Sequence, residues 1–268
     1  MFVEGNTTGT GMLALRRATG LGLRPVFVTS LPSRYAGLEE TGCEVVVCDT
    51  NDAGELRAAV LDRFRLEELA GVMTTSDFYV RTAAGLAAEL GLAGNGVGTV
   101  EICRDKAALR ALANGQAPRT VRSVLVGEAG ELAPALAEIG LPCVLKPVDD
   151  SGSSGVRLCR SKEEARAHAD GLLARRRNGR GQPSSGAVLV EELLEGPEYS
   201  VEMFTAGGEH RLVGVTEKHL AGSPHFVEAM HVFPAPLAED VRDLLAAEVR
   251  RVLTAVGVEV GPPTPRCA

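Results

Sequence analysis

The stretch VLKPVDDSGSSGVRLC, residues 144 to 159, combines an apolar strand pattern, one lysine and a loop rich in Gly, Ser and Asp. Lys146 stands at the end of the apolar run, and Pro147 stiffens the exit from it. Small residues in the loop let backbone N–H groups approach an anion closely. The stretch predicts a hairpin whose loop covers phosphate groups, although an ordinary flexible hairpin would have the same composition.

Arginine is the usual basic residue of this chain, so the few positions that carry lysine instead call for an explanation. Only four of the 28 basic residues are lysines, namely Lys106, Lys146, Lys162 and Lys218. An ammonium group is a compact charge that fits among phosphate oxygens, whereas a guanidinium is a broad planar fork. The G-x-x-x-x-G-K-[ST] spacing of a P-loop is absent, because Lys146 precedes the glycines. Lys162, in the charged stretch SKEEARAHAD, is predicted to be a solvated surface residue.

Composition narrows the class of partner and the compartment. The chain of 268 residues has a net charge of −7 and 4% aromatic residues, which argues against nucleic acid as a partner. The exception is an Arg cluster at 174–186, which is predicted to be a solvated loop. Six cysteines form no C-x-x-C pair, and there is no leader pattern and no membrane-spanning run. A cytoplasmic protein without a membrane partner is expected.

Residues 1–95 alternate short apolar runs with helical patterns, which indicates buried parallel strands with helical crossovers. This α/β segment is predicted to be a Rossmann-like N-terminal domain. Its first turn, GTGMLA from Gly9 to Ala14, fits G-x-G-x-x-A, and an NADP-binding oxidoreductase is therefore one alternative. The second strand ends without an acidic residue to bind ribose, so a tight strand-to-helix turn is the preferred interpretation.

The pattern changes from residue 96 onward. TVEICRDKAALRALANG is predicted to be one helix, ended by Gly115, that puts Lys106 near its start. Many short strands with short connections follow, which predicts an α+β unit of antiparallel sheets with helices on one side. The expected parts are a first subdomain with the Gly-rich flap at 96–186 and a second subdomain at 187–268.

Two further stretches suit a nucleotide site. VLVEELLEGPEYSVEMF, residues 188–204, is an apolar strand followed by carboxylates, two leucines and a Gly-Pro turn. Free backbone groups at a strand exit can read an adenine edge, and a carboxylate shortly afterwards can accept from ribose hydroxyls. GVTEK places Lys218 at the end of another strand. Each stretch alone would also suit a surface turn or a solvated charge run.

Taken in this order, RDKAALR, VLKPVDDSGSSGV and VLVEELLEGPEYSVE resemble the ATP-grasp superfamily, from the N-terminal domain to about residue 260. The resemblance implies that Lys106 and Lys146 contact the α and β phosphates of ATP, and that Lys218 reaches the γ-phosphate as a catalytic residue. It implies that the flap over the triphosphate consists of Ser151, Gly152, Ser153, Ser154 and Gly155. It also implies that Glu191, Glu192, Leu193 and Leu194 read adenine, while Glu198 binds ribose.

The same resemblance implies an activity. A carboxylate–amine ligase of this superfamily joins a small-molecule carboxylate to an amine through an acyl phosphate, with ATP and Mg²⁺, and the superfamily often forms homodimers. The stretch EKHLAGSPHFVEAMHVFPAPL resembles the substrate side of amino-acid and small-peptide ligases, which makes four residues candidates for orienting a substrate: His219, His225, Glu228 and His231. They stand in irregular sequence, without the spacing of a metal site.

The resemblance departs from the superfamily at the C-terminus. The superfamily holds Mg²⁺ with an acidic residue and a Glu-x-Asn pair on late strands, but this sequence has no Glu or Asp after Glu259. An alternative reading frame of Pro263 to Ala268 can encode an acidic strand start, which suggests a truncated or frameshifted ligase lacking its last strands. No metal ligands are assigned for that reason. The alternative function is an ATP-binding remnant or regulatory module without ligase activity.

Overall fold

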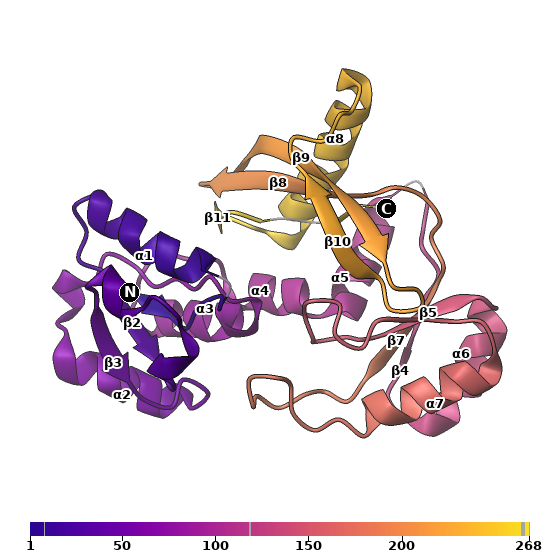
Figure 1. The fold of residues 1–268 in the computed structure, drawn as a ribbon, viewed down its shortest axis with the longest axis horizontal. Coiled ribbons are helices and arrows are strands. Elements are labelled where there is room, and N and C mark those ends of the chain that lie inside the picture. The colour runs from indigo at the N-terminus through magenta and orange to yellow at the C-terminus, as the bar shows by residue number, and fades with distance from the viewer. Residues whose placement is uncertain (8, 118, 264–265, 268) are drawn as a thin grey trace. The chain divides into compact units, whose positions relative to one another are not determined.

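The computed structural model describes residues 1–7, 9–117, 119–263 and 266–267, and its chain divides into two compact units, 1–100 and 101–268 (Figure 1). The alternating part of the sequence thus forms the first unit, and the strand-rich part forms the second. Three of the six residues of the tail that suggested an alternative reading frame, Thr264, Pro265 and Ala268, lie outside the described residues. Within the described ranges, no helix has the length and apolar character needed to cross a membrane.

The first unit contains a parallel sheet in the order β1–β2–β3, as predicted. Its strands are β1 (Phe2–Val3), β2 (Val26–Thr29) and β3 (Glu44–Val47), and Met73 adds a parallel bridge beside Phe2. All four residues of β2 are buried, which is expected for a central parallel strand covered on both faces. The Rossmann-like expectation for this unit is confirmed.

Helices cover both faces of this sheet (Figure 1). α1 (Thr10–Gly20) packs Met12 and Leu15 against Phe2 and Phe27, while α2 (Ala53–Arg63) and α3 (Val80–Glu89) pack against the opposite face. The start of α1 needs glycine at position 11, because a Cβ there would lie 2.9 Å from the carbonyl oxygen of Asn6 in the preceding turn. This close approach supports the tight-turn interpretation of GTGMLA. Short 3-10 helices complete the unit: η1 (Pro32–Arg34), η2 (Glu39–Thr41), η3 (Leu66–Glu68) and η4 (Asp77–Tyr79).

A buried carboxylate joins the carboxyl ends of the three strands. Glu4 follows β1, is 0% exposed, and accepts hydrogen bonds from the hydroxyls of Thr29 (2.9 Å) and Thr50 (2.7 Å). The backbone N–H of Ser30 (2.8 Å) and the hydroxyl of Tyr35 also donate to it. Burial alone would raise the pKa of Glu4, but these hydrogen bonds hold the pKa below its ordinary value. Glu4 is therefore ionised and fixes the strand ends relative to one another.

We expect Glu4→Gln to lower the free energy of unfolding by about 1–3 kcal/mol, because an amide cannot accept from all of these donors. Urea unfolding followed by circular dichroism measures the change. Glu44→Gln is the matched control, since Glu44 is an exposed carboxylate on β3 of the same sheet. The control should change stability by less than about 0.5 kcal/mol.

The pH dependence of this stability follows from the lowered pKa. A carboxylate whose folded-state pKa is depressed stabilises the fold above its unfolded pKa, and this contribution is lost as pH falls through the folded-state value. The stability difference between the wild type and Glu4→Gln should therefore shrink under acid conditions. A difference that stayed constant down to acid unfolding would contradict an ionised Glu4.

Two helices stand at the boundary between the units where the sequence predicted one, and the first of them begins before residue 101. α4 (Val97–Arg104) ends before Asp105, and α5 (Lys106–Gln116) starts after it. The Asp105 side chain accepts from the backbone N–H groups of Ala107 (2.8 Å) and Ala108 (3.0 Å), so this residue is the N-cap of a new helix. The expected stop at Gly115 is also wrong, because α5 continues to Gln116. The break makes Lys106 the first residue of a helix.

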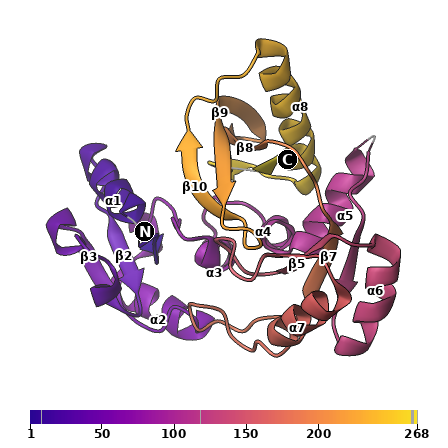
Figure 2. The same cartoon turned by 45° about the vertical axis from the view of Figure 1, so that its right-hand side comes forward.

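The first sheet of this unit is antiparallel, with the order β4–β7–β5–β6. Its strands are β4 (Ser123–Val126), β5 (Cys143–Pro147), β6 (Arg157–Cys159) and β7 (Val188–Glu192). η5 (Ala129–Glu131), α6 (Leu132–Ile139) and α7 (Lys162–Leu173) follow β4 and β6, and the two α-helices cover one face (Figure 2). The expected subdomain boundary at 186 falls before β7, which lies inside this sheet.

The second sheet has the order β10–β9–β8–β11, with β12 also paired to β8. Its strands are β8 (Glu198–Ala206), β9 (Glu209–Ala221), β10 (Val227–Val232), β11 (Val260–Gly261) and β12 (Arg266–Cys267). Val201, Met203 and Val215 point to one face and pack against α8 (Glu239–Val256). α5 adds Leu109 and Leu112 to the same core. The antiparallel sheets with helices agree with the predicted fold class.

The predicted hairpin between β5 and β6 is present and packs closely on α7. Gly155 has a φ of 72°, and a Cβ there would lie 2.9 Å from Leu172 Cδ2 and 3.1 Å from Pro147 Cδ. We expect Gly155→Ala to lower the melting temperature by at least about 2 °C, since strain and overlap act together. Gly179→Ala is the control, because that glycine faces open space and does not have a positive φ. Equal melting temperatures for the two variants would rule out the close approach.

Candidate functional site

Three charged side chains meet on one face of the β4–β7–β5–β6 sheet, the face opposite α6 and α7. In the register of β5 and β7, Lys146 is paired with Leu189 and Val144 with Glu191, so Lys146 and Glu191 share one face at diagonal positions. The Lys146 ammonium forms an ion pair with Oε2 of Glu191. Oε1 of the same carboxylate accepts from Nε of Arg110, on α5, at 2.8 Å. One carboxylate therefore holds two cations from different elements.

Glu191 is ionised in this setting. It is 5% exposed, and burial alone would raise the pKa of its carboxyl group. The positive charges of Lys146 and Arg110, together with their hydrogen bonds, hold the pKa of Glu191 below its ordinary value. Two cations and one anion leave a net positive charge at this position.

Lys106 connects the start of α5 to the segment that follows β5. Its backbone N–H donates to the carbonyl of Val148 (3.0 Å), and its ammonium donates to the carbonyl of Asp150 (2.6 Å). The guanidinium of Arg104 donates to the carbonyl of Asp149 at 2.9 Å. The junction between α4 and α5 thus fixes the three residues that precede the Gly-Ser loop.

The positive charge of Lys146 acts on the ammonium group of Lys106. Burial, and after it the positive charges of Arg104 and Lys146, lower the pKa of Lys106 to about 8. Such mutual repulsion is relieved when an anion enters between the cations. The chemistry of this group of side chains therefore suits a polyanion such as a nucleotide phosphate chain.

The predicted flap, Ser151 to Gly155, is the loop between β5 and β6. Its backbone has positive φ angles at Gly152 (65°), Ser153 (57°) and Gly155 (72°), which are conformations that glycine adopts at the least cost. The loop begins at Asp150, whose carboxylate accepts from the Ser151 N–H at 2.9 Å. The loop is thus short, glycine-rich and fixed at its base.

Asp150 also joins this loop to the end of α7. It is 6% exposed, and its Oδ2 accepts from the guanidinium of Arg175 at 2.7 Å. The preceding residue, Asp149, accepts from Ser184 Oγ (3.2 Å) and the Ser185 N–H (2.6 Å). The two aspartates of the loop are therefore structural supports for it.

The predicted adenine-reading segment lies at the end of β7. Glu192 is the last residue of that strand, and its carboxylate accepts from the backbone N–H (2.8 Å) and Nε (3.1 Å) of Arg122. Leu193 and Leu194 follow outside any strand, and the side chain of Leu194 is exposed. Arg side chains thus hold both carboxylates of this segment, and β7 is paired with β4 on one side and β5 on the other.

Lys218 and Glu198 meet on the second sheet. They are paired in the register of β8 and β9, which brings the predicted ribose and γ-phosphate residues side by side. The Lys218 side chain is 8% exposed, and its ammonium lies 3.1 Å from Oε1 of Glu228. Oε2 of Glu228 lies 2.8 Å from Nε2 of His231. Glu228, one of the four substrate-side candidates, therefore links Lys218 with another of them, His231.

The expectation of irregular sequence around these candidates is wrong. β9 continues to Ala221 and returns as β10, so His219, Glu228 and His231 stand on a regular hairpin and His225 in its loop. The hairpin forms because alternating residues can pair over this length, with one bulge between Glu228 and Met230. His219 has a separate partner, Glu217, at 3.4 Å, so the four candidates do not form one cluster.

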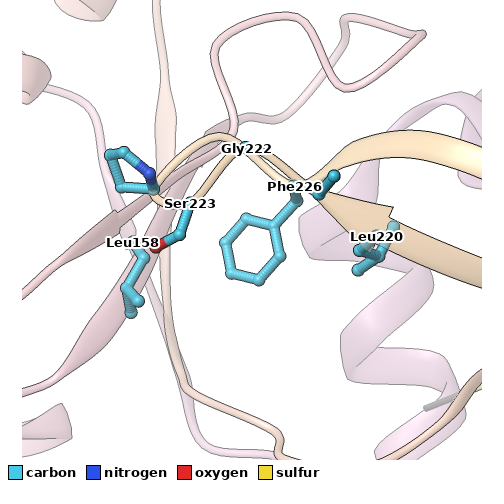
Figure 3. Close-up of a pocket in the computed structure, with 7 residues that line it drawn as sticks. Leu158, Leu220, Gly222, Ser223 and Phe226 are labelled. Carbon is cyan, nitrogen blue, oxygen red and sulfur yellow. The ribbon is translucent and has the colours of Figure 1, made fainter.

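An apolar cavity of about 370 Å³ lies at the tip of this hairpin (Figure 3). The side chains of Leu158, Leu220 and Phe226 line it. The backbone carbonyl of Pro224, another lining residue, accepts from the Leu158 N–H at 2.8 Å. Phe226 has a φ of 46°, a left-handed conformation that is uncommon for a bulky residue. The cavity therefore lies between β6, the edge strand of the β4–β7–β5–β6 sheet, and the β9–β10 hairpin.

Sequence reasoning missed several residues that shape the site, namely Arg104, Arg110, Asp150 and Arg175. One signal was present for Arg110, which stands four positions after Lys106 and so lies on the same face of α5. For the others, no spacing in the sequence indicates their partners. No group of three or more His, Cys, Asp or Glu side chains in the described ranges is placed to hold a metal ion.

Comparisons with known proteins agree with this geometry. Residues 139–263 match the family model described as ATP-grasp domain. The chain is 33% identical over 259 residues to the uncharacterized protein y4rH of Sinorhizobium fredii, covering 96% of this chain and 52% of that protein. It is 27% identical over 218 residues to an alanine–anticapsin ligase of Bacillus amyloliquefaciens, covering 75% of this chain and 44% of the ligase.

The fold also matches a solved structure. The L-amino acid ligase from Bacillus licheniformis superimposes with a TM-score of 0.80 at 21% identity, covering 99% of this chain and 62% of that one. The chain spans about half the length of the curated relatives it matches. These findings favour an ATP-grasp domain over the NADP-binding alternative. With the matching domain, the relatives and the fold in agreement, the chain belongs to the ATP-grasp superfamily and is similar to its L-amino acid ligases.

Proposed function

We propose that this protein is an ATP-dependent ligase that joins the carboxylate of an amino acid or small peptide-like molecule to an amine. The observation that carries the proposal is the position of two lysines next to a short Gly-Ser loop: the Lys106 ammonium binds the carbonyl of Asp150 at the base of that loop, and Lys146 stands on β5, which leads into it. Family membership supports ATP as the source of energy. Similarity to alanine–anticapsin ligases supports an amino acid as one substrate.

In this proposal, different residues bind the phosphates, the adenine and the ribose of ATP. Lys146 and Lys106 bind the α and β phosphates, and backbone N–H groups of residues 151–155 close over the triphosphate. The backbone of residues 191–194 reads adenine, with Glu198 on the ribose. Lys218, beside Glu198, binds the γ-phosphate, where an ammonium group neutralises charge that develops during transfer. No residue of this set acts as a covalent nucleophile.

The reaction then proceeds in two steps. An oxygen of the substrate carboxylate attacks the γ-phosphorus, which gives an acyl phosphate and ADP. The amine nitrogen attacks the acyl carbon and displaces phosphate, which forms the amide. Closure of the Gly-Ser loop excludes water that would otherwise hydrolyse the acyl phosphate. Mg²⁺ would supply further neutralisation of phosphate charge.

The cavity at the hairpin tip supports an apolar amino acid as a substrate. Its volume of about 370 Å³ suits a single side chain, and it is lined mainly by apolar groups. In the β9–β10 ladder Leu220 is paired with Glu228, whose two carboxylate oxygens already contact Lys218 and His231. The apolar wall is therefore the part of this surface that would receive a substrate side chain.

Phosphate release tests the activity. The protein with ATP and Mg²⁺ should release phosphate when both an amino-acid carboxylate and an amine are supplied, and release should be greater with leucine or phenylalanine than with aspartate. A screen of amino-acid pairs with mass detection of the dipeptide identifies the substrates. Nucleotide binding without phosphate release for any pair would support a regulatory module and contradict the ligase.

Lys146→Ala should weaken ATP binding by at least about tenfold, because a buried cation facing the phosphates is lost. Isothermal titration calorimetry with ATP measures this change. Lys162→Ala is the matched control, since Lys162 is an exposed lysine on α7 of the same unit and should leave the affinity unchanged. Equal loss in both variants, or in neither, would remove Lys146 from the nucleotide site.

A further inference from the structure

We propose that Arg110 is a positioning residue that retains Glu191 while Lys146 moves to the phosphates of ATP. This inference rests on the proposed function, because it concerns the same nucleotide site. Arg110 contributes from α5, and Lys146 and Glu191 from the adjacent strands β5 and β7. The three side chains are 27%, 18% and 7% exposed, respectively, so their interactions are largely shielded from water.

The need for such a residue follows from the ion pair of Lys146. Its ammonium is bound to a carboxylate that is almost completely buried. A lysine that turns to a phosphate group leaves its former partner behind, and a buried carboxylate without a counter-ion is costly. If Glu191 had Lys146 as its sole cation, the pair would resist separation and the nucleotide would bind weakly.

Arg110 meets this need by its geometry. Its Nε donates a hydrogen bond to Oε1 of Glu191 at 2.8 Å, while the Lys146 ammonium pairs with Oε2. The two cations therefore do not compete for one oxygen. Departure of Lys146 would leave a buried Glu191–Arg110 pair, which is neutral overall. A guanidinium suits this role, because it stays protonated and is fixed on a helix that does not need to move with the ligand.

The position of Arg110 on α5 links this function to Lys106. The two residues are four positions apart and therefore lie on one helix face. Lys106 donates to the carbonyl of Asp150 at the base of the Gly-Ser loop, while Arg110 reaches the centre of the sheet. One helix thus supplies a cation for the phosphates and a counter-ion for Glu191.

ATP affinity measured by calorimetry tests the inference. Arg110→Leu should weaken ATP binding by about tenfold or more, because Glu191 then retains Lys146. Arg110→Lys keeps the charge and should recover most of the affinity. Arg166→Leu is the control, since Arg166 is an exposed arginine on α7 of the same unit. That substitution should leave the affinity as in the wild type.

The double variant separates the electrostatic role from a packing role. Glu191→Gln removes the charge that Arg110 balances, so adding Arg110→Leu to it should change ATP affinity by less than about threefold, against tenfold in the wild-type background. A purely structural Arg110 would give the same loss in both backgrounds, and this result would overturn the inference. Should Arg110→Leu not fold, Arg110→Gln carries the same expectation.

The outcomes distinguish this inference from the proposed function. Wild-type protein that gives no heat with ATP would overturn both. Wild-type protein that binds ATP, together with an Arg110→Leu variant that binds it equally well, would overturn the role of Arg110 and leave the ligase proposal intact. Weakened binding in Arg110→Leu with recovery in Arg110→Lys, and no further loss in the Glu191→Gln background, supports the role.

Discussion

The ionised carboxylate of Glu191 sets the main constraint on the face of the β4–β7–β5–β6 sheet that lies opposite α6 and α7. A buried charge must be compensated, and here two cations from separate elements compensate it. The two contacts connect β5 with β7 and attach α5 to the same sheet. It also leaves an excess of positive charge, because Lys146 and Arg110 together outweigh Glu191. A stabilising contact and a phosphate-attracting potential therefore come from one group of residues.

The segment before the Gly-Ser loop, residues 148–150, is held in place by contacts with the neighbouring helices. Lys106 and Arg104 bind carbonyl groups of residues 148–150, and Arg175 binds the Asp150 carboxylate from the end of α7. These contacts leave the loop from 151 to 155 fixed at its base and composed of small residues. A loop of this kind can change conformation over a ligand without disturbing the sheet behind it. The cost is a Lys106 that is buried among other cations, which lowers its pKa to about 8.

The comparison of sequence and structure shows where local signals are sufficient. The hairpin around Gly155 was predictable, because an apolar run, a glycine-rich loop and a second apolar run specify it locally. The break at Asp105 was not recognised, although Asp is a favourable N-cap, because the helical pattern continues on both sides of it. The β10 strand was missed because residues 222–226 interrupt the alternation. The family resemblance pointed to the lysines, but it gave Glu191 and Glu228 other roles than the ion pairs they form with Lys146 and Lys218, and it did not indicate Arg110.

Apart from β10 and the break between α4 and α5, the sequence by itself determined the order of strands and helices, together with the ATP-grasp resemblance and the positions of the lysines, since these depend on periodicity and on short motifs. Tertiary structure decided the partners. Arg110 and Glu191 are 81 residues apart in the chain, and their contact requires both the β5–β7 register and the packing of α5. A shift of one residue in that register would turn Lys146 to the opposite face of the sheet. Burial of apolar side chains against α6 and α7 selects the observed register, and this selection exists only once the sheet is assembled.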